Sequence, residues 1–127
     1  MKSCLICDDH EMMREALSGT VAMGWPDAEV TQAADYPSAW AAAARKPDLI
    51  ISDLVMPGAS PVDGVRRLAE TAPETPILVV TGNEDDAVLM ALLRMGVAGF
   101  AIDRVVADNG VSGVSTRLAE RPEPLRR

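Results

Sequence analysis

Four aspartates and one threonine stand where short apolar runs of the sequence end. Asp8 and Asp9 follow the first run, Asp53 and Thr81 close two later runs, and Asp103 follows the last. Carboxylates that converge repel one another unless they are protonated or neutralised by a cation. Such oxygen ligands suit Mg²⁺ or Mn²⁺, which bind a few carboxylates and keep several waters.

A carboxylate beside such an ion can act as a nucleophile toward a phosphoryl group, because the ion screens its charge and stabilises the phosphoryl oxygens. Thr81 could donate a hydrogen bond to one of those oxygens. This combination predicts phosphoryl transfer onto an aspartate. Simpler roles stay open for each residue taken alone: a capping box of Asp8 with Glu11, and turn formation at Asp53.

Alternating strand and helix patterns must bring these residues together. Apolar runs predict strands at 3–7, 28–33, 48–55, 75–82 and 99–102, and helical periodicity predicts helices at about 9–23, 37–45, 61–71 and 84–95. The (βα)5 order predicts a parallel sheet covered by helices on both faces. In such sheets the working site lies outside the carboxyl ends of the strands.

The first helix should turn Met13, Ala16, Leu17, Thr20 and Val21 inward, because they follow a helical spacing. The stretch after residue 103 has only a weak helical stripe at Val111, Val114 and Leu118, interrupted by glycines, so we expect a last helix that is short or irregular. We expect one domain over residues 1–121 and a tail or linker over 122–127.

Composition narrows the class of protein. The 127 residues carry a net charge of −7 and four aromatic side chains, which argues against nucleic-acid binding by this domain. No apolar run reaches the roughly 20 residues of a membrane span, and the N-terminus does not resemble a signal peptide, so we expect a cytoplasmic protein.

Cys4 and Cys7 form a C-x-x-C pattern that invites a redox or zinc interpretation. Both lie inside the first predicted strand, where positions three apart point to opposite faces. Zinc would also need ligands beyond the single His10. We therefore expect two small buried apolar residues.

Four segments together resemble the receiver domain of bacterial two-component response regulators: LICDDHEMMREAL, DLIISDLVMPG, PILVVTG and GVAGFAI. The resemblance covers residues 1 to about 103. It implies a flavodoxin-like, doubly wound sheet with the strand order 2-1-3-4-5. It also implies a signalling domain rather than a conventional enzyme, although receivers can catalyse their own phosphotransfer and dephosphorylation.

The resemblance assigns functions residue by residue. Asp53 matches the phosphoacceptor, and Asp8 and Asp9 match the acidic pair that binds Mg²⁺ together with Asp53. Val55 matches the position whose backbone carbonyl completes the metal site.

The resemblance also implies a switch and partners. Thr81 matches the hydroxyl residue that follows the phosphoryl group, and Phe100 matches the aromatic residue that changes rotamer with it. A sensor histidine kinase or phosphotransfer protein would supply the phosphoryl group. The run DDHEMMRE, with His10 and Arg14, looks most like regulators whose receiver precedes a helix-turn-helix output domain, which is absent from these residues.

The sequence departs from the family at the end of the last strand. Asp103 stands where receivers carry a lysine, beside the expected phosphoryl group. At about 4 Å and an effective dielectric near 20, each unit charge pair is worth on the order of 4 kcal/mol before solvent screening. Arg104 could substitute for the lysine if the loop turns back. The loop at Ser60-Pro61 is a second departure, since the family has an acidic or small residue and glycine there. In an alternative alignment, Asp63-Gly64 is that pair and the loop before it contains inserted residues.

Three hypotheses follow. The first is a phosphoacceptor domain that uses Mg²⁺ and Asp53. The second is an atypical receiver that acts as a phosphorylation-independent interaction module, because Asp103 replaces the lysine; apolar residues outside the inward stripe of helix 84–95 suggest a homodimer. The third, an aspartyl phosphohydrolase, would need an acid at position 55, where Val55 stands.

Overall fold

The computed structural model describes residues 1–81, 90–92, 94, 99–102 and 115–117. Within them one sheet has the strand order β2-β1-β3-β4-β5-β6. Its strands are β1 Ser3–Cys7, β2 Glu29–Ala33, β3 Leu49–Asp53, β4 Ile77–Thr81, β5 Gly99–Ile102 and β6 Ser115–Arg117. The first five are parallel, and their order confirms the predicted fold class.

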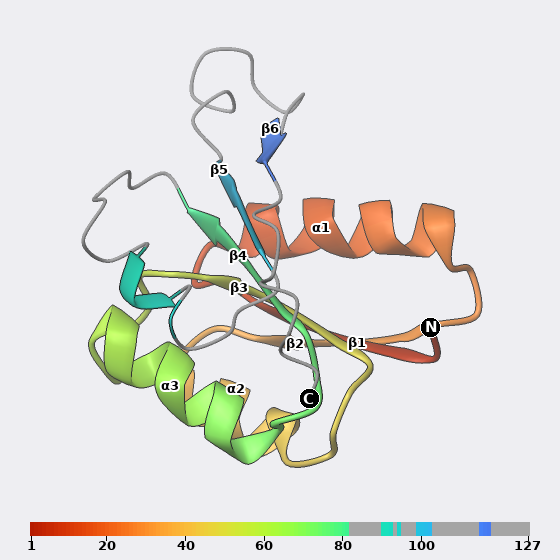
Figure 1. The fold of residues 1–127 in the computed structure, drawn as a ribbon. Helices are drawn as coiled ribbons and strands as arrows, with labels where there is room; N and C mark the ends of the chain where they lie inside the picture. Colours follow the sequence, from red (N-terminus) through yellow and green to blue (C-terminus); the bar gives the residue numbers. More distant parts are fainter. Residues whose placement is uncertain (82–89, 93, 95–98, 103–114, 118–127) are drawn as a thin grey trace.

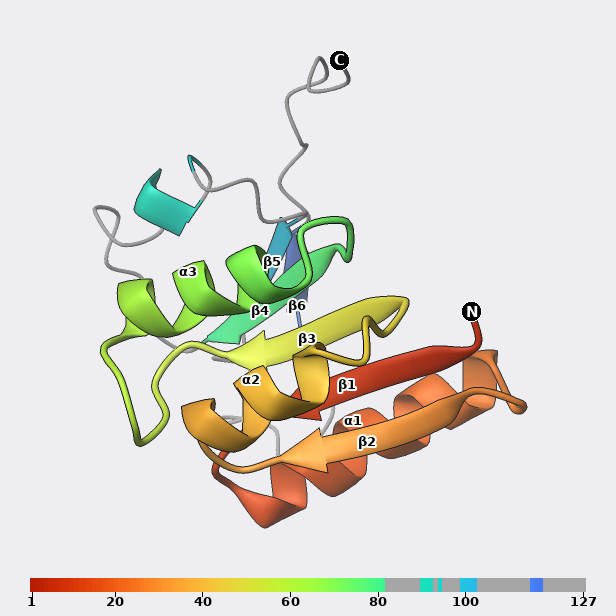
Figure 2. The same ribbon diagram turned by 90° about the horizontal axis from the view of Figure 1, so that it is seen from below.

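Helices cover both faces of this sheet (Figures 1 and 2). Helix α1 (Glu11–Gly24) lies on one face, and α2 (Tyr36–Ala43) and α3 (Pro61–Thr71) lie on the other. Ser60 caps α3 by accepting the Asp63 N–H at 3.3 Å, and proline occupies the first position of that helix. The unusual Ser60-Pro61 pair thus starts a regular helix.

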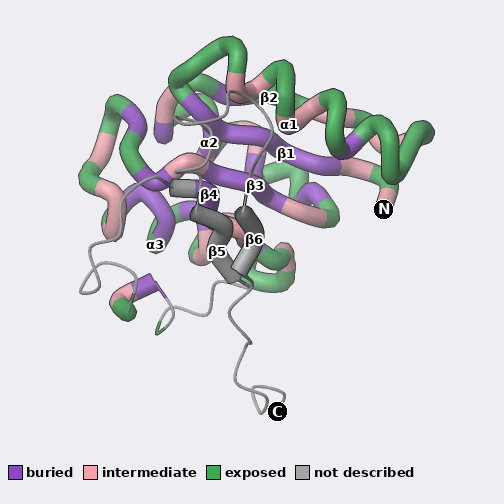
Figure 3. Tube along the Cα trace, turned by 90° about the horizontal axis from the view of Figure 1, so that it is seen from above, coloured by how far each residue is buried: buried purple, intermediate pink, exposed green. Residues whose placement is uncertain are grey.

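The core consists of two apolar clusters, one on each face of the sheet. The larger cluster contains Leu5, Cys7, Tyr36 and Leu68, and it lies beneath α2 and α3. The smaller cluster contains Cys4, Ile6, Val21, Ile51 and Val80, on the face that α1 covers. Figure 3 shows that β1 and β3, two neighbouring interior strands, are buried over most of their length. The two cysteines lie on opposite faces, as predicted.

Helix α1 differs from the prediction in two respects. It begins at Glu11 rather than Asp9, and its N-cap is His10, so the capping-box interpretation of Asp8 and Glu11 is wrong. Its inward stripe is also narrower: Val21 is buried and Leu17 half-buried, whereas Ala16 and Thr20 are exposed.

The end of the chain contains a strand where a weak helical stripe was predicted. Residues Ser115–Arg117 form β6, antiparallel to β5. This pairing satisfies backbone groups of β5 that would otherwise form an open sheet edge. Val111, Val114, Leu118 and the predicted boundary at residue 121 lie outside the described residues. None of the helices that the structure describes is long and apolar enough to span a membrane.

Candidate functional site

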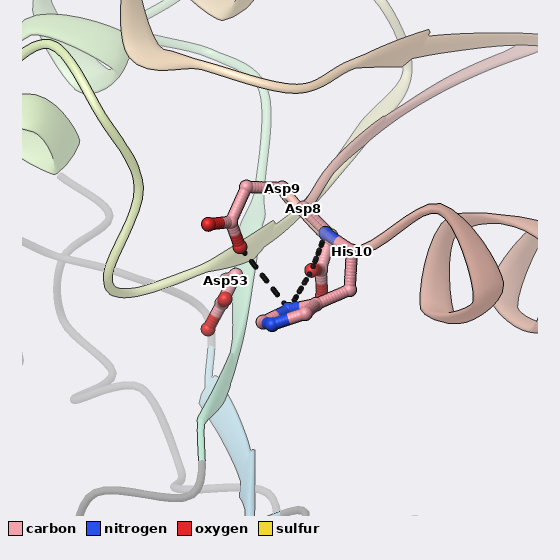
Figure 4. A group of neighbouring side chains, drawn as sticks. All are labelled: Asp8, Asp9, His10 and Asp53. Carbon is pink, nitrogen blue, oxygen red and sulfur yellow. Dashed lines mark hydrogen bonds and ion pairs between the residues drawn. The ribbon is translucent and has the colours of Figure 1, made fainter.

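The acidic residues meet at the carboxyl ends of two neighbouring strands, β1 and β3 (Figure 4). Strand β1 leads directly into Asp8 and Asp9, and β3 ends at Asp53. The register pairs Cys7 with Ser52, so the residues that follow in each strand come to the same level. Asp8, Asp9, His10 and Asp53 each offer one ligand atom, and these four atoms lie within 4.8 Å of one another.

Asp8 is the buried member of this acidic cluster, with only 4% of its surface exposed. Its Oδ1 accepts the His10 backbone N–H at 2.8 Å and lies 3.1 Å from His10 Nδ1. Asp9 Oδ1 lies 3.1 Å from the same ring nitrogen. The hydrogen bond to Asp8, helped by the charge of Asp9, raises the pKa of His10. The imidazole therefore lies between two carboxylates, at the exposed side of the site.

Asp53 sits in an environment that disfavours its negative charge. Burial, followed by the nearby charge of Asp8, raises the pKa of Asp53 to about 6. Two backbone donors act in the opposite direction: the Leu54 N–H, at 2.7 Å from Oδ1, and the Val55 N–H. A carboxylate under these influences is suited to accept a proton or a neighbouring cation.

The donor set fits a hard divalent cation. Ligand atoms on opposite sides of one Mg²⁺ lie about 4.2 Å apart, because Mg²⁺ binds oxygen at 2.0–2.1 Å. The 4.8 Å spread of the acidic cluster needs only small side-chain adjustments to reach that size. Carboxylate oxygens that open to water at a sheet edge are also the ligands Mg²⁺ prefers.

Residues that the sequence analysis did not single out support the two acidic segments. Arg14, noted only for its resemblance to a family motif, donates from Nη1 to the Asp8 carbonyl at 2.8 Å and from Nε to Gln32 Oε1 at 3.0 Å. The Tyr36 hydroxyl donates to the Leu54 carbonyl at 2.7 Å. These bonds fix the backbone on both sides of the site, and only the fold reveals them.

For some of the other predicted site residues the structure describes only the backbone. Thr81 ends β4 and Phe100 lies in β5 opposite Val79, so both positions are on strands of the same sheet. The side chains of Thr81 and Phe100 lie outside the described part, as do Asp103 and Arg104. Val55 follows β3 with its side chain exposed.

Comparison with known proteins connects this geometry to a family. The response regulator receiver domain model matches residues 4–108. The glycerol metabolism activator of Pseudomonas putida is 35% identical over 102 residues, which cover 79% of this chain and 46% of that protein. The chain thus spans about half the length of this curated relative.

Solved structures agree with the sequence match. The chemotaxis response regulator CheY4 of Vibrio cholerae is 30% identical with a TM-score of 0.69, over 80% of this chain and 86% of that one. A response regulator from Burkholderia pseudomallei, with a phosphorylated aspartic acid, calcium ion and citrate, is 27% identical with a TM-score of 0.63. The match covers 79% of this chain and 58% of that one. From the acidic cluster at the strand ends and these matches together, it follows that the chain belongs to the response regulator receiver domain family, the signalling domains of two-component systems.

Proposed function

We propose that this domain accepts a phosphoryl group on Asp53 in a Mg²⁺-dependent reaction and thereby switches a protein–protein interaction surface. The observation that carries the proposal is the convergence of Asp8, Asp9 and Asp53 at the ends of β1 and β3. The similar Burkholderia pseudomallei protein carries a phosphorylated aspartic acid and a cation, which supports this chemistry here.

Asp8, Asp9 and Asp53 would hold the ion, with the backbone carbonyl of Val55. When bound, Mg²⁺ supplies charge neutralisation for the phosphoryl oxygens. One carboxylate oxygen of Asp53 attacks phosphorus, the bond between phosphorus and a histidine nitrogen of the donor breaks, and that nitrogen keeps the electron pair. The donor imidazole then takes up one proton from solvent, and Asp53 becomes an acyl phosphate.

Residues of the chain prepare Asp53 for this step. The Leu54 N–H orients its carboxylate, and Arg14 holds the loop that carries Asp8. Thr81, at the end of β4, would bond a phosphoryl oxygen, and Phe100 would respond by changing rotamer.

The partners follow from this chemistry. The phosphoryl donor would be a sensor histidine kinase or a phosphotransfer protein in the cytoplasm. Because the chain spans about half of its curated relative, a DNA-binding output domain after residue 127 is part of the proposal. The net charge of −7 makes DNA contact by the receiver itself unfavourable.

A second candidate function rests on Asp103, which replaces a lysine and adds negative charge where a phosphoryl group would sit. In this alternative the domain is a phosphorylation-independent interaction module. Met90, in a described turn of the predicted helix 84–95, is 49% exposed and would belong to a homodimer surface. A monomer mass that is independent of concentration in sedimentation would reject that dimer.

The intact mass after incubation with a small-molecule phosphodonor separates the two functions. With Mg²⁺ we expect a gain of one phosphoryl group, lost on omitting Mg²⁺ and in Asp53→Asn. Calorimetric titration with Mg²⁺ is the companion measurement. Mg²⁺ binding without any gain in mass would favour the interaction module, and no Mg²⁺ binding would refute phosphoryl transfer.

A further inference from the structure

Tyr36 lies beneath the loop that follows Asp53 and is the only tyrosine of the chain. It is completely buried, with 0% of its surface exposed, in the cluster under α2 and α3. Two polar groups of Tyr36 donate hydrogen bonds to that loop. The hydroxyl donates to the Leu54 carbonyl at 2.7 Å, and the backbone N–H donates to the Pro57 carbonyl at 2.9 Å. Tyr36 therefore fixes both ends of the segment 54–57.

The first of these bonds determines the direction of a second group. The Leu54 carbonyl and the Val55 N–H belong to one peptide unit, and the described backbone contains no cis peptide bond. In a trans peptide the C=O and N–H point in opposite directions. Because the phenol binds the Leu54 carbonyl, the Val55 N–H points away from the phenol, and this N–H lowers the pKa of the Asp53 carboxyl.

The ring that carries the hydroxyl has little freedom to move. A Cβ added to Gly64 of α3 would lie within 2.3–2.5 Å of three atoms of the Tyr36 ring, so only glycine leaves room for it. Trp40 stacks on the Tyr36 ring, with 6.1 Å between the ring centroids, and donates from Nε1 to the Gly64 carbonyl at 3.1 Å. Arg67 lies 4.4 Å above the Trp40 ring. The phenol is thus held in place by the packing of α2 against α3.

We propose that Tyr36 is a positioning residue, which holds the Leu54–Val55 peptide so that the Val55 N–H points at the carboxylate of Asp53. The inference rests on the proposed function, in which Asp53 receives the phosphoryl group. A donor preset in this direction would stabilise the charge on the Asp53 oxygens and on the incoming phosphoryl group without reorganising during the reaction.

Tyr36→Phe tests the proposal because it removes the hydroxyl and keeps the ring. In the Mg²⁺-free protein, we expect the Val55 amide proton to move upfield in the ¹⁵N–¹H spectrum, since the N–H is no longer held toward the Asp53 carboxylate. With Mg²⁺ and a small-molecule phosphodonor, we expect the phosphorylation rate to fall roughly tenfold. Removing a preset donor outright typically costs more, about 10²–10³.

Trp40→Phe is the matched control. It removes one hydrogen bond from the same α2–α3 contact, but it keeps an aromatic ring beside Tyr36 and leaves the groups that bind 54–57 intact. We expect the melting temperature of Trp40→Phe to fall by about as much as that of Tyr36→Phe. The Val55 amide shift and the phosphorylation rate should stay at their wild-type values. Equal effects of both variants on the amide shift and the rate would overturn the proposal, as would wild-type values in Tyr36→Phe.

Two further measurements test the role of Tyr36. If Tyr36→Phe does not fold, 3-fluorotyrosine can be placed at the single tyrosine of the wild-type sequence. Its ¹⁹F signal should shift on adding Mg²⁺ and beryllofluoride, and an unchanged signal would contradict the coupling. If the wild-type protein is not phosphorylated, the proposed function fails, but the Val55 amide in the Mg²⁺-free protein still decides the role of Tyr36.

Discussion

The carboxyl group of Asp53 is subject to two opposing influences. Burial and the charge of Asp8 raise its pKa, while the N–H groups of Leu54 and Val55 lower it, and the balance lies at about 6. In the ion-free protein at neutral pH, Asp53 is therefore charged at a cost to stability. This cost is the driving force that favours a cation at the site.

Asp53→Asn should stabilise the ion-free protein at pH 7.5 and have little effect near pH 4. The folded-state pKa of about 6 lies above the ordinary aspartate pKa of 3.8, so the folded protein binds more protons than the unfolded chain between these values. The free energy of unfolding contributed by Asp53 therefore falls as pH rises through this window, and asparagine removes that loss. Urea unfolding in EDTA at both pH values measures the difference.

Asp63→Asn is the control for this experiment. The Asp63 side chain is 67% exposed and pairs with Arg66 on the surface of α3. Its replacement should change the free energy of unfolding by less than about 1 kcal/mol at either pH. A variant Asp53→Asn that is less stable than the wild type at pH 7.5 would contradict the proposed balance of forces.

The convergence of Asp8, Asp9 and Asp53 could be predicted from the sequence because each residue ends an apolar run, and parallel strands align their ends. The contributions of His10 and Tyr36 could not. His10 enters the cluster only because the backbone turns after Asp8, and Tyr36 reaches Leu54 across 18 residues of sequence. Local patterns carry no information about either contact.

The two cysteines of strand β1 lie on opposite faces of the sheet. Cys4 lies in the smaller cluster and Cys7 in the larger one. Burial raises the pKa of Cys4 to about 11 and is the main reason why the pKa of Cys7 rises to about 12. Alternation along a strand thus keeps the C-x-x-C pattern from forming a redox or zinc pair.

Both thiols should resist modification in the folded protein. At pH 8 we expect no reaction with a disulfide reagent such as DTNB on the timescale of minutes, because the thiolate is the reactive form and both groups are buried. In denaturant two thiols per chain should react at once. Rapid reaction of one equivalent under native conditions would contradict the burial of that cysteine.

Element types were predictable where periodicity was strong, and element boundaries were less so. Strands β1, β3 and β4 match apolar runs because interior parallel strands are buried on both faces, whereas β2 lies at the edge of the sheet, is mostly exposed and has a weaker apolar pattern. Strand β6 was missed, since three polar residues, Ser115 to Arg117, have no apolar pattern and form a strand by pairing with β5. The sequence pattern predicts too early a start for α1, because Asp8 accepts the His10 backbone N–H instead of capping the helix.

On the scale of the whole molecule, the two faces of the sheet contribute unequally to the core. Beneath α2 and α3, Leu68 is completely buried in the larger cluster. On the opposite face α1 contributes Val21 as its buried residue, and Leu17 packs against the smaller cluster while only half-buried. Most of the described apolar burial thus lies on the α2–α3 face.

Truncating one leucine on each face should reveal this asymmetry. Leu68→Ala should lower the free energy of unfolding by about 2–5 kcal/mol, as expected for a fully buried leucine. Leu17→Ala should cost on the order of 1 kcal/mol, because less apolar surface returns to water. Urea denaturation of both variants measures the two values; equal losses would show that the α1 face contributes as much as the other.

The fit between Tyr36 and Gly64 has a consequence for how this sequence can diverge. A side chain at position 64 collides with the ring, and a smaller residue at position 36 leaves a void beneath the Asp53 loop. Either change alone therefore destabilises the fold unless the other position changes with it, which makes the two positions epistatic. Lineages that descend from this protein should keep the tyrosine–glycine pair or replace both residues together, and a designer who grafts one position without the other would inherit the same penalty.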